Sequence, residues 1–249
     1  MSAEALRRRH TDQRVLALLD ASRHSLAALQ AAVELAAQRR AELLALYVED
    51  QDLLHSAEFP FALEVGARSG LARPLTPVQM QATLARQLQR ARGALEAAVA
   101  GRNLAHSLQV SRGRVVAAAL AVAGPGDLLV LGKAGLSAHC GGVRLGSNCR
   151  ALVLQAPCAV LLQDERHPPR TGPLRVLSEP VPEALLALPL CDHIERLPVQ
   201  DALGLERLLA PARSGALLLH RAELQQLTGE DPELLARIPV PVIVVPDPH

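Results

Sequence analysis

The 249-residue sequence is poor in aromatic side chains: it lacks tryptophan and has one tyrosine and two phenylalanines. Apolar residues still make up 49% of the chain, so a core must be built from aliphatic side chains. No uninterrupted apolar run is long enough to span a bilayer, and residues 1–13 lack the apolar segment of a signal peptide. We therefore expect a cytoplasmic globular protein with no membrane contact.

Long tracts of one charge are also absent. The formal net charge is +1, so nothing favours nucleic acid or an acidic membrane as a partner. The four cysteines include no Cys-x-x-Cys pair and fit reduced thiols better than a disulfide framework. A zinc site at His139-Cys140 would have no further ligands at recognisable spacing, so we expect no metal there.

Lysine is nearly absent, and its single occurrence marks the most informative segment. Lys133 lies within Gly132-x-x-Gly135, directly after the apolar run Leu128–Leu131, and Gly146-Ser147 opens the next helical segment. Glycines let a backbone approach a ligand closely, and the amides at a helix start can bind phosphate. The pattern predicts a nucleotide site with Lys133 as a candidate phosphate-binding charge. The alternative is a turn that only packs a helix against a strand.

Apolar segments that read as strands alternate with helical segments along the first two thirds of the chain. The expected strands are Arg14–Leu19, Glu42–Val48, Ala105–Ser111, Leu128–Leu131 and Cys158–Leu162. The expected helices are Ser25–Arg39, Pro77–Ala100, Gly113–Ala123 and Asn148–Gln155. This alternation predicts an α/β fold with an open five-stranded parallel sheet and helices on both faces. Ligands bind beyond the carboxyl ends of such strands, where Asp20, Val48 and Gly132 fall.

The last third of the chain weakly repeats the end of the first part. Residues 164–173 are rich in proline and read as a linker. Beyond it, Gly215–His220 parallels Asp127–Gly132, and Leu234–Val245 parallels Leu152–Gln163. The second copy is about half as long and has no counterpart of the glycine motif. We therefore predict a nucleotide-binding domain at residues 1–163 and a smaller degenerate α/β repeat at residues 174–249.

Three segments resemble the universal stress protein family: Arg14–Leu26, the glycine motif from Gly132 to Ser147, and Ala156–Leu161. The resemblance covers about residues 13–163. It implies a Rossmann-like sheet of the adenine-nucleotide alpha-hydrolase type that, in ATP-binding members, holds the nucleotide at its strand ends. It further implies that Asp20 contacts the adenosine part and that the backbone of Val48 lines the adenine. The residues implied for ribose and phosphates are Gly132, Gly135, Gly146 and Ser147.

The same resemblance implies a regulatory output in the stress response rather than an enzyme, and pairing of domains through their last strands. We expect a protein that binds ATP or another adenine nucleotide, with Mg²⁺ as an optional companion, and that signals through unidentified protein partners; weak ATP hydrolysis stays open. We expect Val240–Val245 to pair with Cys158–Leu162 in an intramolecular pseudo-dimer, with a homodimer as the alternative. Gly135 and Gly146 flank ten residues instead of the family's nine. A scaffold that keeps the fold without the nucleotide is therefore the competing hypothesis.

The few aromatic residues cluster. Tyr47, Phe59 and Phe61 lie within or beside the irregular stretch Gln51–Thr76. Phe59 and Phe61 could form a lid or a contact surface, or they could pack locally under a long loop. A nucleophilic hydrolase is the least favoured function, because the sequence has no Gly-x-Ser-x-Gly elbow.

Overall fold

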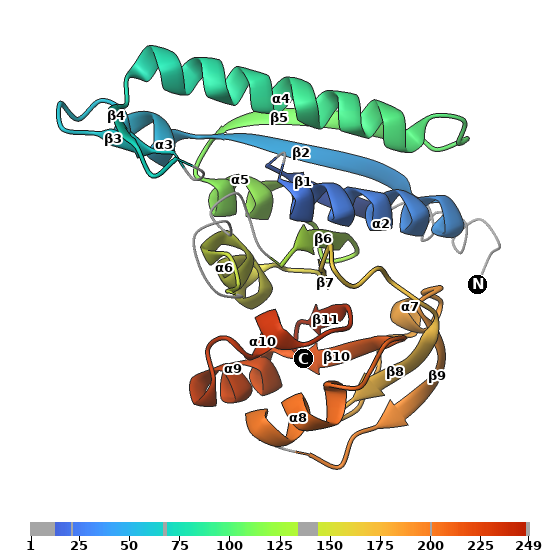
Figure 1. Cartoon of the computed structure of the whole chain (residues 1–249). Coiled ribbons are helices and arrows are strands. Elements are labelled where there is room, and N and C mark those ends of the chain that lie inside the picture. The colour runs from blue at the N-terminus through green and yellow to red at the C-terminus, as the bar shows by residue number, and fades with distance from the viewer. Residues whose placement is uncertain (1–12, 21, 67–68, 134–143, 200, 248–249) are drawn as a thin grey trace.

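The computed structural model describes residues 13–20, 22–66, 69–133, 144–199 and 201–247. Within these ranges the chain forms a nine-stranded sheet flanked by helices, and a separate two-stranded ribbon (Figure 1). The strand order of the large sheet is β5-β2-β1-β6-β7-β11-β10-β8-β9. No helix in the described part of the chain is both long and apolar enough to cross a membrane.

The first five strands of this order form the parallel sheet that the sequence predicts. They are β5 (His106–Gly113), β2 (Glu42–Asp50), β1 (Arg14–Leu19), β6 (Leu128–Gly132) and β7 (Ala159–Gln163). All four neighbouring pairs among them are parallel. The central strands are buried on both faces, which is why they appear in the sequence as continuous apolar runs.

Helices cover both faces of this parallel sheet, as expected. They are α2 (Arg23–Arg39), α4 (Pro77–Val99), α5 (Val115–Val122) and α6 (Ser147–Gln155). Successive side chains of a strand point to opposite faces. Accordingly, Val15 packs into the apolar cluster that contains α2 and α4, whereas Leu16 packs into the cluster that contains α5 and α6. Both clusters continue into the second half, so each forms a core on one face of the whole sheet.

The stretch expected to be irregular contains short elements. These are α3 (Gln51–Ser56) and an antiparallel ribbon of β3 (Leu63–Val65) and β4 (Ala72–Pro74). The rings of Phe59 and Phe61 stack with their centroids 5.5 Å apart, and the two residues are 55% and 76% exposed. The rings therefore pack on each other at the surface and not beneath a loop, and a lid or a contact surface stays a prediction.

The last four strands repeat the order of the first half. They are β11 (Val242–Val245), β10 (Ala216–His220), β8 (Gly172–Val176) and β9 (Cys191–Arg196). Read outward from the junction, β11-β10-β8-β9 corresponds to β7-β6-β1-β2, with no counterpart of β5. This half also carries α7 (Glu183–Leu186), α8 (Ala202–Leu209), α9 (Arg221–Glu230) and α10 (Leu234–Arg237). The strand β8 begins inside the expected linker, at Gly172.

The two halves join through β7 and β11, which lie side by side near the middle of Figure 1. The strands are antiparallel, with Val242 opposite Leu162, Ile243 opposite Leu161 and Val244 opposite Val160. All six side chains are buried. The predicted pairing of Val240–Val245 with Cys158–Leu162 is thus confirmed, and one continuous sheet runs through both halves.

Candidate functional site

A cavity of about 350 Å³ opens at the carboxyl ends of β1, β2 and β6. Its walls come from these strand ends, from α3 and α4, and from the first turn of α6. In the sheet, β1 lies between β2 and β6. After β1 the chain adds β2 and β5 on one side of it, and then β6 and β7 on the other side. Ligands of open α/β sheets bind at such a reversal of strand order. The cavity therefore lies where the sequence predicts a site.

Most of the predicted site residues meet at this cavity although they are far apart in the sequence. Those that line it are Asp20, Val48, Gly132, Gly146 and Ser147. Gly135 lies outside the described residues. Lys133 is the one described candidate that does not line the cavity.

The turn between β1 and α2 fixes the carboxylate of Asp20. The amide of Ser22 donates to Oδ1 of Asp20 at 2.9 Å, and the amide of Asp20 donates to Oγ of Ser25 at 3.3 Å. The helix itself is capped by Ser22, whose Oγ accepts from the amide of Ser25 at 3.1 Å. Asp20 thus organises the turn without being the cap, and its Oδ2 has no hydrogen-bond partner among the described residues.

Gly132 is required by packing as well as by the cavity. A Cβ at this position would lie 2.6 Å from the backbone carbon of His24 and 2.8 Å from its Cβ, in the first turn of α2. The end of β6 and the start of α2 therefore approach each other more closely than any side chain allows. The packing interpretation of the glycine motif holds for this residue, and the nucleotide interpretation remains a proposal.

The amides expected to face a phosphate are not all free. The amide of Gly146 donates to the carbonyl of Lys133 at 3.0 Å and closes the base of the glycine loop. By contrast, the amides of residues 147–149 have no hydrogen-bond partner among the described residues, and no side chain caps α6. All three residues line the cavity. The first turn of α6, and not the amide of Gly146, therefore offers the bare donors.

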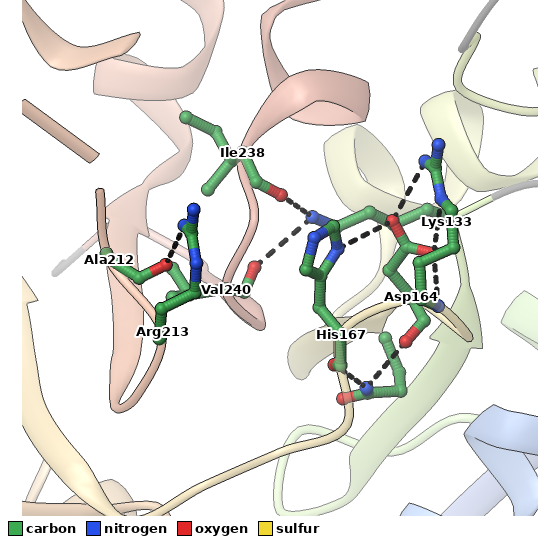
Figure 2. A network of polar contacts seen from close by, with 9 residues as sticks. Lys133, Asp164, His167, Ala212, Arg213, Ile238 and Val240 are labelled. Atoms are coloured by element: carbon green, nitrogen blue, oxygen red, sulfur yellow. Dashed lines mark hydrogen bonds and ion pairs between the residues drawn. The ribbon is translucent and has the colours of Figure 1, made fainter. Parts of the chain in front are cut away.

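Lys133 points to a different place from the one that the sequence suggests (Figure 2). Its Nζ donates to the carbonyl of Ile238 at 2.5 Å and to that of Val240 at 3.2 Å, both in the second half. The side chain is buried, and burial lowers the pKa of Lys133 to about 8 although the carboxylate of Asp164 opposes this shift. Two of the three donors of this ammonium group are used at the junction, and Lys133 does not line the cavity, so the geometry does not bring it to the expected phosphate position.

The sequence reasoning missed the contribution of α3 and α4 to the cavity. Gln87 and Leu84 of α4 line it, and the hydroxyl of Tyr47 donates to the carbonyl of Leu84 at 3.1 Å. Burial, together with the charges of Glu49 and Asp20, raises the pKa of Tyr47 to about 12, so the phenol stays neutral. Only the wide separation of these residues in the sequence, 37 positions for Tyr47 and Leu84, hid the contact.

Comparison with known proteins places these features in a family. Residues 12–163 match the family model of the universal stress protein family. A universal stress protein from Archaeoglobus fulgidus DSM 4304 is 12% identical, and the alignment covers 95% of this chain and 97% of that one with a TM-score of 0.53. This likeness concerns the fold of both halves.

Two further solved structures align with 61% of this chain and 97% of their own. Universal stress protein UspA from Lactobacillus plantarum is 23% identical with a TM-score of 0.43. A universal stress protein in complex with cAMP is 22% identical with a TM-score of 0.40. No curated protein matches the sequence.

Proposed function

Since the chain belongs to the universal stress protein family, we propose that it is a regulatory protein whose first half binds an adenine nucleotide in the cavity at the ends of β1, β2 and β6. One observation carries the proposal. The cavity brings together Asp20, Val48 near the end of β2, and the first turn of α6, whose amides have no partner among the described residues. A carboxylate, a strand end and a helix N-terminus are complementary to a nucleoside joined to a phosphate.

Each part of the cavity suits one part of such a ligand. Oδ2 of Asp20 would accept a hydrogen bond from a ribose hydroxyl or from the amino group of adenine. Apolar side chains of Leu18, Leu53 and Val115 would surround the base, beside the backbone of Val48. The amides at the start of α6 and the hydroxyl of Ser147 would hold phosphate oxygens. ATP, alone or with Mg²⁺, belongs to the ligand class that this proposal covers.

The proposed output is regulatory, with residues 1–163 as the ligand-binding domain and residues 174–249 as a degenerate repeat that packs against it. Protein partners would then sense the occupied state of the cavity. If the chain is instead a scaffold that retains the fold without a nucleotide, the cavity should bind no adenine nucleotide. Ligand binding therefore separates the two functions.

The test is calorimetry with adenine nucleotides on the purified full-length chain. We expect binding to the wild type and at least a tenfold loss of affinity in Asp20→Asn, which keeps an acceptor for the amide of Ser22 but removes the carboxylate charge. Glu34→Gln, an equal change of charge on the exposed face of α2, is the matched control and should bind like the wild type. If the wild type gives no heat of binding at millimolar nucleotide, the scaffold hypothesis is supported.

A further inference from the structure

A second cavity, of about 120 Å³, lies where the two halves of the chain meet. Its walls come from the segment after β7, the turn before β10 and the proline-rich segment before β11. Figure 2 shows a residue of each: His167, Arg213 and Val240. Arg166 and Arg170 also line the cavity, and its described lining contains no aspartate or glutamate. The junction therefore holds a basic cavity.

The charge of Arg166 is matched by a carboxylate behind the cavity wall. Nη2 of Arg166 donates to Oδ2 of Asp164 at 3.0 Å, and its Nε donates to Oδ1 at 3.3 Å. Nδ1 of His167 lies 3.3 Å from the same carboxylate. Asp164 is buried and does not line the cavity. It thus fixes the guanidinium group of Arg166, whose Nη1 has no partner within the described ranges.

The other two arginines of the cavity have no carboxylate partner in the described part of the chain. The guanidinium group of Arg170 makes neither a hydrogen bond nor an ion pair there, and Arg213 uses only Nη1, on the carbonyls of Ala210 and Ala212. Both arginines are exposed, so a solute can reach them. Two guanidinium groups that lack a counter-ion and line one small cavity repel each other, and an anion between them removes this repulsion.

Backbone contacts hold the segments of Arg170 and Arg213 together. The amide of Gly215 donates to the carbonyl of Arg170 at 2.8 Å. Gly215 has a φ of 77°, and a Cβ at this position would overlap the carbonyl oxygen of Pro173. Only glycine therefore lets the turn before β10 approach the segment after β7 so closely. This approach does not depend on the two arginine side chains, which stay available to a ligand.

We propose that this cavity binds a phosphate group, either as inorganic phosphate or as part of a small phosphate monoester. Guanidinium groups bind phosphate oxygens through two parallel N–H donors and stay charged at physiological pH. The cavity is smaller than the roughly 300–1,000 Å³ of pockets that enclose whole drug-sized ligands, so it suits one such group and not a nucleoside. The inference is independent of the proposed function, because the two cavities share no described residue.

The first experiment is calorimetry on the full-length wild type at constant low ionic strength, with inorganic phosphate and glycerol 3-phosphate as probes. We expect saturable binding of one phosphate group at the junction of each chain. Tighter binding of glycerol 3-phosphate would support the inference with a monoester as the ligand, and equal or weaker binding would support it with the free ion. If neither probe binds saturably, the inference is overturned.

The second experiment removes one guanidinium group. Arg170→Gln should lower the affinity for phosphate by roughly fivefold or more. It should unfold in urea like the wild type, because the side chain has no partner among the described residues. Arg170→Lys keeps the charge but not the forked donors, and should bind with intermediate affinity.

The matched control is Arg92→Gln, which removes the same charge from an exposed position of α4 that does not line the cavity. It should bind phosphate like the wild type. Phosphate that binds Arg170→Gln as tightly as the wild type lies elsewhere, for example at the start of α6, and this result would overturn the inference. An equal loss of affinity in Arg92→Gln would do the same, because the effect would then come from the net charge alone.

Discussion

A single glycine, Gly132, supports both the fold and the cavity. It ends β6, lines the cavity, and lies so close to the first turn of α2 that a Cβ would meet the backbone of His24 at 2.6 Å. The backbone at Gly132 therefore cannot move toward α2 without displacing this helix from the sheet. Asp20, in the turn before α2, and Ser25, in its first turn, also line the cavity. Packing and ligand access therefore depend on the same missing side chain.

Gly132→Ala should destabilise the protein by roughly 1–3 kcal/mol, the usual cost of overpacking a close contact. Urea unfolding of wild type and variant measures this difference. Gly93→Ala is the control, because Gly93 is exposed in α4 and a Cβ there meets nothing within 4 Å. It should stabilise the protein by about 0.5–1 kcal/mol through helix propensity. A Gly132→Ala variant as stable as the wild type would contradict the packing argument.

The segments that follow β6 and β7 carry buried charged groups, and one of these groups, Lys133, contacts the second half (Figure 2). After β6, Lys133 donates to the carbonyls of Ile238 and Val240. After β7, Arg166 donates to the buried carboxylate of Asp164 at 3.0 Å, and Nδ1 of His167 lies 3.3 Å from it. Burial alone would raise the pKa of Asp164, but the hydrogen bonds from Arg166 and the charges of Arg166 and Lys133 lower it to about 2.

This arrangement predicts a specific sensitivity to acid. The folded-state pKa of Asp164 lies below its ordinary value of 3.8, so the carboxylate stabilises the fold above about pH 4 and loses this effect as the pH falls toward 2. Between pH 5 and pH 2, the free energy of unfolding should fall by about 2 kcal/mol more in the wild type than in Asp164→Asn. Urea unfolding across this range measures the difference.

The control for the acid experiment is Asp52→Asn, whose side chain is 63% exposed. Its stability should change with pH in parallel with the wild type, because an exposed ion pair contributes little. Parallel curves for the wild type and Asp164→Asn would show that the buried carboxylate does not supply the expected stabilisation.

Elements differed in how well the sequence predicted them. The runs Leu128–Leu131 and Cys158–Leu162 were informative because parallel strands are buried on both faces and therefore remain apolar throughout. The ribbon of β3 and β4 was missed because its strands are three residues long and exposed, so they carry no periodic pattern. The direction of Lys133 could not be predicted either, since its partner Ile238 is 105 residues away.

On the scale of the whole molecule, the sheet has no free edge at the junction. The strand β11 covers β7, and the sheet ends at β5 and β9, which are largely exposed. The strand β9 carries Asp192, Glu195 and Arg196. Charged side chains on an edge strand disfavour pairing with another chain. The covered edge at β7 and the charged edge at β9 therefore both disfavour a homodimer that pairs through these strands.

Sedimentation of the full-length protein should therefore give the mass of one chain at micromolar concentration. A chain that ends at Gln163 would uncover β7, whose residues are mostly buried in the intact protein, and should self-associate through that edge. A full-length dimer, or a truncated chain that stays monomeric, would show that the pairing of β7 with β11 does not determine the assembly.

Because one sheet joins two unequal halves, the chain also has a defined number of ligand sites. Two identical copies of the first half would present two equivalent cavities, and occupation of one could alter the other. In this chain the place of Gly132 is taken in the second half by His220, a buried residue whose amide donates to Glu223 at 2.8 Å. A ligand held as proposed would therefore saturate the protein along a simple hyperbola, one molecule per chain. The response to its concentration would be graded and without cooperativity.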